Sequence, residues 1–182
     1  MTPGRPATSS PADARTANLL GALSLTVGDA VEAAVEDAGG RGGVMPAALV
    51  LLHDEPGMSV TELGRATSLS QPGAVRLVEE LERSGLVARG PGADARTHAL
   101  RLTPLGSRRV RRILAARAAV LDRLLAPLPS AERRSLEGLL ERLLEAWTGD
   151  EAHAVSVCRL CDTNLCPLDR CPVELGWRAS AG

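Results

Sequence analysis

Apolar residues recur at helical spacing in three long segments outside the centre of the chain. Between Asn18 and Ala38 they share one helix face, at Leu20, Leu23, Val27, Val31 and Ala34. Two further helical patterns cover Pro104–Leu125 and Ala131–Trp147, separated by a Pro-containing break. The second carries a broad apolar stripe opposite Glu and Arg, formed by Leu136, Leu139, Leu140, Leu143 and Leu144. These patterns predict long amphipathic helices on both sides of the central region.

The central pattern differs, because a short helix is followed by two short strands. The spacing of Val75, Val78 and Leu81 predicts a helix from Ser70 to Glu82, and Gly85 provides a left-handed stop behind it. Strand-like residues 86–89 and 99–103 then flank a loop over 90–97 that contains Gly, Pro and Asp and carries two arginines at its rim. A helix followed directly by a basic-tipped hairpin predicts a winged helix, which points to DNA.

A second helix precedes this unit. Ser59 and Glu62 have the spacing of a capping box, which predicts a short helix over 60–67. The break at 68–70 then gives the helix, short turn and helix of a helix-turn-helix motif. The second helix of such a motif enters the major groove, where glutamine can read adenine and arginine can contact guanine or phosphate. Five residues occupy the first turns of this helix: Ser70, Gln71, Gly73, Ala74 and Arg76. The alternative is that Ser70 and Gln71 only cap the helix and that Arg76 is a solvated surface residue.

Residues from about Met45 to Gly106 resemble the MarR (multiple-antibiotic-resistance regulator) family of winged-helix transcription factors. The resemblance rests on segments 59–64, 69–72, 76–78, 81–82, 85–89, 94–96 and 102–106. The most family-specific part is Asp94-Ala95-Arg96 followed by L-T-x-x-G. The resemblance implies that Arg96 enters the minor groove and that Asp94 orients it, and a narrow minor groove does attract a fixed guanidinium. A surface ion pair that holds the hairpin is compatible with this role.

The resemblance also implies a homodimer built by the terminal helices, which binds a pseudo-palindromic double-stranded operator and acts as a repressor. The apolar stripes suit a dimer interface, although packing within one chain is the alternative. We therefore expect a mainly α fold with a small β-hairpin wing, and a wing surface over 89–97. The predicted DNA-binding residues are Ser70, Gln71, Gly73, Ala74, Arg76, Arg89, Asp94, Arg96 and Thr97.

The expected organisation is one winged-helix domain with two tails. Residues 1–16 are rich in Pro, Ser, Ala and Gly and predict a disordered tail. Residues 17–147 form the winged-helix domain with its dimerisation helices, around a DNA-binding core at 45–106. Residues 148–182 form a C-terminal tail that holds all four cysteines.

Charge is unevenly distributed in this nearly neutral chain. Residues 59–112 contain ten Arg against five acidic residues, so the positive charge lies on the half expected to bind DNA. Arg108, Arg109, Arg111 and Arg112 contact phosphate or form a solvated helix face, two alternatives of equal weight. The sequence shows no run expected to span a membrane and no signal peptide at Met1, which predicts a cytoplasmic protein without a membrane partner.

The four cysteines, Cys158, Cys161, Cys166 and Cys171, lie within fourteen residues as C-x2-C-x4-C-x4-C-P. In a chain without export signals this spacing favours a metal site over disulfides. The ligand spacing resembles a zinc knuckle, although the internal Gly and aromatic residues of the knuckle are missing, and Zn²⁺ is the expected ion. An iron–sulfur cluster is the main alternative, because Cys-Pro at the last ligand is similar to ferredoxin runs. Redox-active disulfides or unligated thiols are a third.

Such a site is either structural, folding the tail on metal binding, or sensory, changing DNA affinity when metal or thiolate is lost.

An enzyme is not expected, because the sequence contains no catalytic triad and no phosphate-binding loop, and its three histidines are scattered. Two other functions stay open. One is a repressor that responds to a small-molecule effector and carries a purely structural zinc tail. The other is a winged-helix adaptor that binds protein instead of DNA.

Overall fold

The computed structural model describes residues 10–40, 43–91 and 98–180. The expected fold class is confirmed, since helices dominate and the sheet has two strands among these residues. The elements are α1 (Pro11–Gly39), α2 (Met45–Asp54), α3 (Val60–Ala66), α4 (Gln71–Arg83), β1 (Val87–Pro91), β2 (His98–Leu102), α5 (Pro104–Leu125), α6 (Ser130–Trp147), α7 (Glu151–Cys158) and α8 (Pro172–Ser180).

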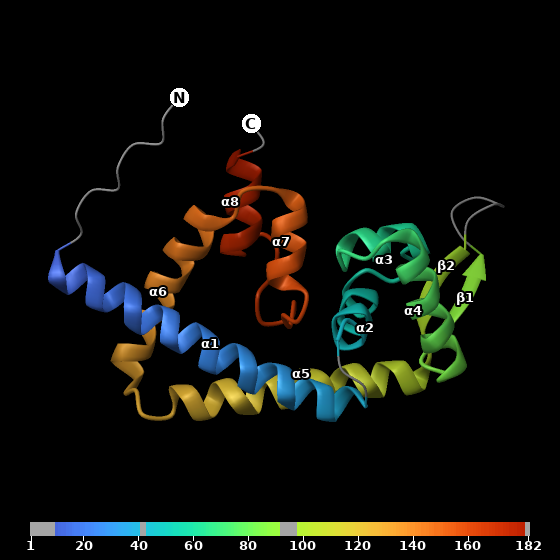
Figure 1. Ribbon diagram of the computed structural model, residues 1–182, viewed down its shortest axis with the longest axis horizontal. Helices are drawn as coiled ribbons and strands as arrows, with labels where there is room; N and C mark the ends of the chain where they lie inside the picture. Colours follow the sequence, from blue (N-terminus) through green and yellow to red (C-terminus); the bar gives the residue numbers. More distant parts are fainter. Residues whose placement is uncertain (1–9, 41–42, 92–97, 181–182) are drawn as a thin grey trace.

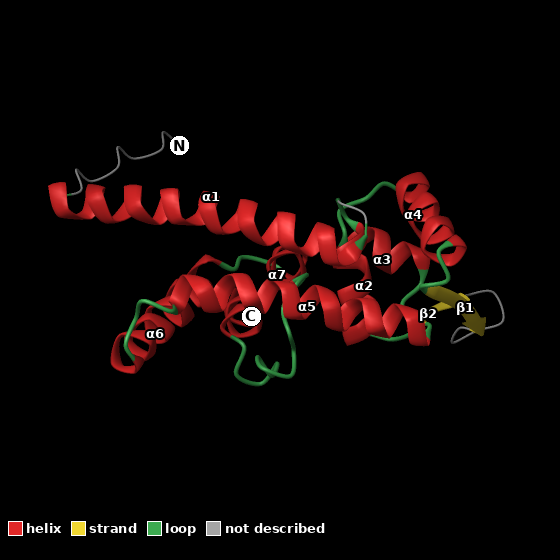
Figure 2. Cartoon of the chain, turned by 90° about the horizontal axis from the view of Figure 1, so that it is seen from below, coloured by secondary structure: helices red, strands yellow, loops and turns green. Residues whose placement is uncertain are grey.

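A winged-helix lobe, made of α2 to β2, lies at one end of two long helices. α1 and α5 lie side by side and run in opposite directions, and α6 leaves the far end of α5 (Figure 1). The helices α7 and α8 fold back between α6 and α3, so the C-terminal segment returns to the winged-helix lobe (Figure 1). Figure 2 shows the same arrangement from below, with the wing at the end of the molecule opposite α6.

The main core lies where the lobe meets the long helices. Its buried side chains come from every element of the lobe and from α1 and α5; the largest that are fully buried are Leu49, Leu52, Leu63, Leu81, Leu100 and Ile113. A second, smaller cluster forms in the C-terminal segment around Ala154, Cys171 and Val173. Residues 148–180 therefore contain two helices with a small core of their own.

The N-terminal helix begins earlier than the sequence indicated. A disordered tail was expected to residue 16, but α1 starts at Pro11. Ser10 and Asp13 form a capping box, in which the backbone N–H of Asp13 donates to Ser10 Oγ over 3.2 Å. Pro11 fits the first helical position, where its missing N–H costs nothing.

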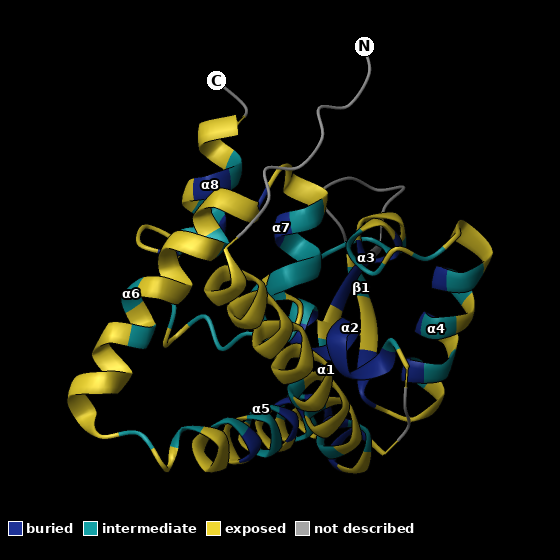
Figure 3. Cartoon of the chain, turned by 60° about the vertical axis from the view of Figure 1, so that its left-hand side comes forward, coloured by how far each residue is buried: buried dark blue, intermediate teal, exposed yellow. Residues whose placement is uncertain are grey.

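The same helix corrects the prediction that no run is long enough to span a membrane. By length and composition alone, α1 qualifies as such a helix among the described residues. The reason is that no charged residue occurs between Arg15 and Asp29. Much of this surface is exposed: Leu19, Leu20, Leu23 and Leu25 are 46–70% accessible, and α1 is predominantly exposed in Figure 3.

Candidate nucleic-acid interface

Local sequence signals position the two helices of the helix-turn-helix. The predicted capping box of α3 is confirmed: the Ser59 backbone N–H donates to Glu62 Oε2 over 2.7 Å, and the Glu62 N–H donates to Ser59 Oγ over 3.2 Å. The first of these bonds is the main reason why the pKa of Glu62 lies below its ordinary value. In the turn that follows, the Leu69 N–H donates to the Gly64 carbonyl over 2.8 Å.

The two helices touch at Gly64 and Ala74. A Cβ placed on Gly64 would lie 2.8 Å from the Ala74 Cβ, so glycine is what permits this close approach of α3 and α4. Ala74 is fully buried there. The sequence had placed Ala74 among the base-contacting residues, and this is corrected: its methyl group packs against α3 and is not available to DNA.

The other predicted residues of the first turns remain accessible. Ser70, Gln71 and Arg76 are exposed on the outer side of α4, and Gly73 is half-buried. Ser70 occupies the N-cap position with an extended backbone, but its side chain accepts no capping hydrogen bond. The alternative in which Ser70 only caps the helix is therefore wrong, because its hydroxyl makes no capping hydrogen bond.

The wing is anchored to the helix-turn-helix on one side and to α5 on the other. β1 and β2 are antiparallel, with Val87 opposite Leu102 and Pro91 opposite His98. The Thr103 hydroxyl donates to the Gly85 carbonyl over 2.6 Å and accepts from the Gly106 N–H over 3.0 Å, which caps the start of α5.

Arg89 lies on β1, exposed, and its Nε donates to Glu82 Oε2 of α4 over 3.1 Å. This ion pair links β1 to the end of α4. The remaining predicted wing residues, Asp94, Arg96 and Thr97, lie outside the described residues.

One arginine of the basic segment on α5 has a structural task that the sequence did not reveal. Arg109 donates from Nη1 to the Gly39 carbonyl and so caps the C-terminus of α1. Arg108, Arg111 and Arg112 are exposed. No local signal identifies Arg109, because its partner lies 70 positions away in the chain.

The structure brings the four cysteines together around the loop between α7 and α8. Cys158 ends α7, Cys161 closes a turn in which its N–H donates to the Cys158 carbonyl over 2.8 Å, and Cys171 directly precedes α8. Cys158 lies next to Cys161 and Cys171, and Cys166 lies next to Cys171, close enough for their thiols to influence one another. All four are free thiols.

These contacts separate the acidities of the thiols. The hydrogen bond from Cys158 lowers the pKa of Cys161 to about 6, and the Arg117 guanidinium acts in the same direction. The pKa of Cys158 is correspondingly raised. Burial is the main cause that raises the pKa of Cys166 to about 11. Across residues 10–40, 43–91 and 98–180, no three His, Cys, Asp or Glu side chains are already arranged around a point where a metal ion would sit.

Comparison with known proteins agrees with this geometry. The sequence model of the MarR family matches residues 46–97, which contain α2, α3, α4 and β1. A putative transcriptional regulatory protein for the hcr operon of Thauera aromatica is 34% identical over 96 residues. Residues 46–97 are therefore similar to the MarR family. The matched segment covers 52% of this chain and 58% of the Thauera protein, so the chain spans little more than half the length of that relative.

Solved structures of MarR proteins share the fold. The YusO protein of Bacillus subtilis has a TM-score of 0.62 at 24% identity, over 76% of this chain and 99% of that one. The Mycobacterium tuberculosis MarR family protein Rv2887, in a crystal structure of its complex with DNA, has a TM-score of 0.54 at 29% identity. That alignment covers 68% of this chain and 96% of that one.

Proposed function

We propose that the protein is a MarR-type transcriptional regulator that binds a double-stranded DNA operator as a homodimer and represses transcription. The observation that carries this proposal is the exposed first part of α4, held rigidly against α3 by the contact between Gly64 and Ala74. A cytoplasmic location follows from the proposal, because the regulator acts where the DNA is. No catalytic step is assigned to the chain.

The side chains on α4 have the chemistry of a base-reading surface. Gln71 can pair with the major-groove edge of adenine, and Arg76 with guanine or a phosphate. The Ser70 hydroxyl, which caps nothing, is placed at the start of α4 where a phosphate oxygen can accept from it. Half-buried Gly73 has no side chain to project beside these groups, which favours a close approach of the helix to the groove.

The wing supplies the second contact. Arg89 is exposed but paired with Glu82, and a DNA phosphate would compete with that carboxylate for the guanidinium. By resemblance to the family, Arg96 enters the minor groove and Asp94 orients it, and Thr97 is a further predicted DNA-binding residue of the wing. Together, α4 and the wing would cover adjacent major and minor grooves of one half-site.

Two long apolar surfaces suit the homodimer. Exposed leucines line α1, and α6 has no buried residue although it carries a leucine stripe. Figure 3 shows both helices as largely exposed along their length. The large exposed residues of the α6 stripe and its end are Leu139, Leu140, Leu143 and Trp147, at 45–79% accessibility. Apolar surfaces of this extent mark interaction sites, and a second copy of the chain would cover both.

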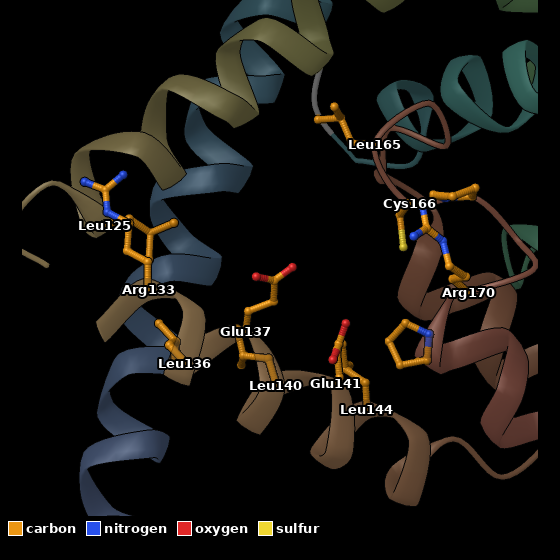
Figure 4. A pocket seen from close by; sticks show the side chains of 12 residues that line it. Leu125, Arg133, Leu136, Glu137, Leu140, Glu141, Leu144, Leu165, Cys166 and Arg170 are labelled. Carbon is orange, nitrogen blue, oxygen red and sulfur yellow. The ribbon is translucent and has the colours of Figure 1, made fainter. Parts of the chain in front are cut away.

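A cavity favours a second candidate, a repressor that responds to a small molecule. It has a volume of about 530 Å³ and lies between α6 and the loop that carries Cys166. Figure 4 shows Leu136, Leu140 and Leu144 along one wall, with Glu141 and Arg170 near its rim. This size suits a small organic ligand, and the leucines favour an aliphatic one. A rise in melting temperature with a ligand that also releases the operator would support this candidate.

The test of DNA binding starts from a random double-stranded library, from which the purified full chain selects its site. Fluorescence anisotropy on the selected duplex then compares Arg76→Ala and Gln71→Ala with Arg123→Ala, an exposed control at the far end of α5. Each α4 variant should lose about 1–3 kcal/mol of binding free energy, whereas the control should bind like the parent. Failure to select any sequence would contradict the proposal.

The adaptor alternative is separated by Arg96→Ala. Loss of this wing arginine should abolish binding to the selected duplex if Arg96 reads the minor groove. A protein-binding adaptor would select no duplex in the first place, and its partner binding would not depend on Arg96.

A further inference from the structure

The cysteine loop lies where three parts of the molecule meet. Leu160, inside the Cys158–Cys161 turn, packs against the main core of the winged-helix lobe. Cys158 and Cys166 instead pack with buried Cys171 in the second cluster, next to Leu144 of α6. A short loop thus contacts the DNA-binding lobe on one side and a dimerisation helix on the other.

A hydrogen bond strengthens the contact with the lobe. Thr163, between the second and third cysteines, donates from Oγ1 to Asp54 Oδ1 at the end of α2 over 3.0 Å. Burial raises the pKa of Asp54, and this bond opposes that shift, as expected for a half-buried carboxylate with one donor. The helix α7 also packs on α3, the first helix of the helix-turn-helix.

The loop has little else to hold it. Between Arg159 and Arg170, the described residues form only turns. In two of these turns the Leu165 N–H donates to the Asp162 carbonyl and the Arg170 N–H donates to the Pro167 carbonyl, each over 3.0 Å. Leu165 is 82% exposed. A segment with so few buried apolar groups needs another source of stability to keep one shape.

Four thiols gathered in this part of the chain could provide that source by binding a metal ion. Thiolates are soft ligands that select zinc, and four of them satisfy its tetrahedral preference. Arg117 and Arg159 lie near Cys161, and their positive charges would offset the net negative charge of a zinc ion bound by four thiolates. Two carboxylates have the opposite effect: Asp54 near Cys161 and Glu141 near Cys166. The thiols are not yet arranged around one point, and small zinc sites reach that arrangement on binding the ion.

We propose that Cys158, Cys161, Cys166 and Cys171 bind one zinc ion, and that this ion fastens the loop at 159–170 to both the winged-helix lobe and α6. Each thiol gives its proton to solvent as it binds, and no electron is transferred. The zinc site acts as a clamp between the winged-helix lobe and α6. The clamp does not depend on the DNA-binding proposal.

The test uses the full chain, purified without oxygen or chelator. Elemental analysis should find one zinc per chain without iron or acid-labile sulfide. Cobalt(II) added to protein stripped of metal should give the visible spectrum of a tetrahedral thiolate site. Because the chain has only four cysteines, alkylation followed by mass spectrometry counts the protected thiols directly.

Variants test separately which cysteines bind the metal and whether the loop is fastened to the winged-helix lobe. Cys161→Ser and Cys166→Ser, at half-buried positions, should lose stoichiometric metal while the winged-helix lobe stays folded. Thr163→Val should keep the metal, but hydrogen exchange should become faster at the end of α2, because the bond to Asp54 is gone. Ser135→Ala on α6 is the control that changes neither.

Hydrogen exchange on the parent protein measures the clamp itself. Zinc removal should speed exchange in α7, α8 and the end of α2, and zinc addition should restore it. Any of three results would overturn the proposal. The protein could contain iron with sulfide, it could contain a disulfide after anaerobic purification, or its four free thiols could take up neither zinc nor cobalt. Bound zinc without any change in exchange at α2 would overturn the clamp.

Discussion

The contact between Gly64 and Ala74 predicts that one methyl group on α3 will disturb α4. In Gly64→Ala the new Cβ would lie 2.8 Å from the Ala74 Cβ. Carbon atoms in contact prefer about 3.5–4.0 Å, so the helices must separate by roughly 1 Å. Ala74 cannot rotate away, because its Cβ is fixed to the backbone of α4. The base-reading side chains of α4 would move with it.

Two opposing terms set the stability change. Overpacking a tight contact costs about 1–3 kcal/mol, whereas replacing a helical glycine by alanine gains about 1 kcal/mol. The free energy of unfolding should therefore fall by about 0–2 kcal/mol. The free energy of operator binding should weaken by about 1–3 kcal/mol if the shift breaks one bidentate base contact, which is a larger loss than that of stability.

The assay combines urea unfolding with anisotropy on the selected operator. The double variant Gly64→Ala/Ala74→Gly exchanges the positions of the methyl group and should recover operator affinity. Gly138→Ala is the matched control, since its added Cβ meets nothing within 4 Å, and it should only gain helix stability. The reasoning would be refuted if the effects of Gly64→Ala and Ala74→Gly on the free energy of operator binding were additive to within about 0.5 kcal/mol. It would also be refuted if Gly64→Ala bound the operator as tightly as the parent.

Three other variants test further parts of the account. Ser59→Ala should lower the free energy of unfolding by about 1 kcal/mol at pH 7, through loss of the α3 cap. Because the Glu62 carboxylate has a lowered pKa in the folded protein, its contribution is present above its ordinary pKa and is lost as pH falls through the lowered value. Ser59→Ala keeps the backbone N–H that is the main cause of the lowered pKa, so urea unfolding should show nearly the same cost of this substitution in acid as at pH 7. A cost that disappears in acid would contradict this. Leu139→Glu with Leu143→Glu should halve the mass measured by light scattering, and an unchanged mass would argue against α6 in the dimer. Gly106→Ala would place a Cβ in a severe clash with the Leu86 carbonyl oxygen at the start of the wing and should cost at least about 3 kcal/mol, whereas a stable, operator-binding variant would show that α5 can shift there.

Local signals explain most of what could be predicted from the sequence. The capping box at Ser59, the cap at Thr103 and the left-handed glycine at 85 each depend on neighbours within a few residues or on one φ angle. Amphipathic spacing placed α5 and α6 to within one residue at each end. Short-range pattern was therefore sufficient for the fold class, but it did not predict α2, α7 or α8.

Contacts between distant segments could not be predicted in this way. Helical spacing put Ala74 on the accessible side of α4, but the fit against Gly64 buries it. The cap that Arg109 provides for α1 and the bond from Thr163 to Asp54 join residues 70 and 109 positions apart. The spacing of the cysteines predicted that they act together, but not that Leu160 ties their loop to the main core.

The most direct test of the proposed function is footprinting of the selected DNA site by the full-length protein at physiological salt. A homodimer that reads DNA with α4 and the wing should protect two related half-sites whose centres are about 10 base pairs, or a whole multiple of that, apart. Arg76→Ala should weaken both half-sites together. Protection of a single unpaired site, or binding with no preference for the selected sequence, would contradict the proposal that this chain is a dimeric DNA-reading regulator.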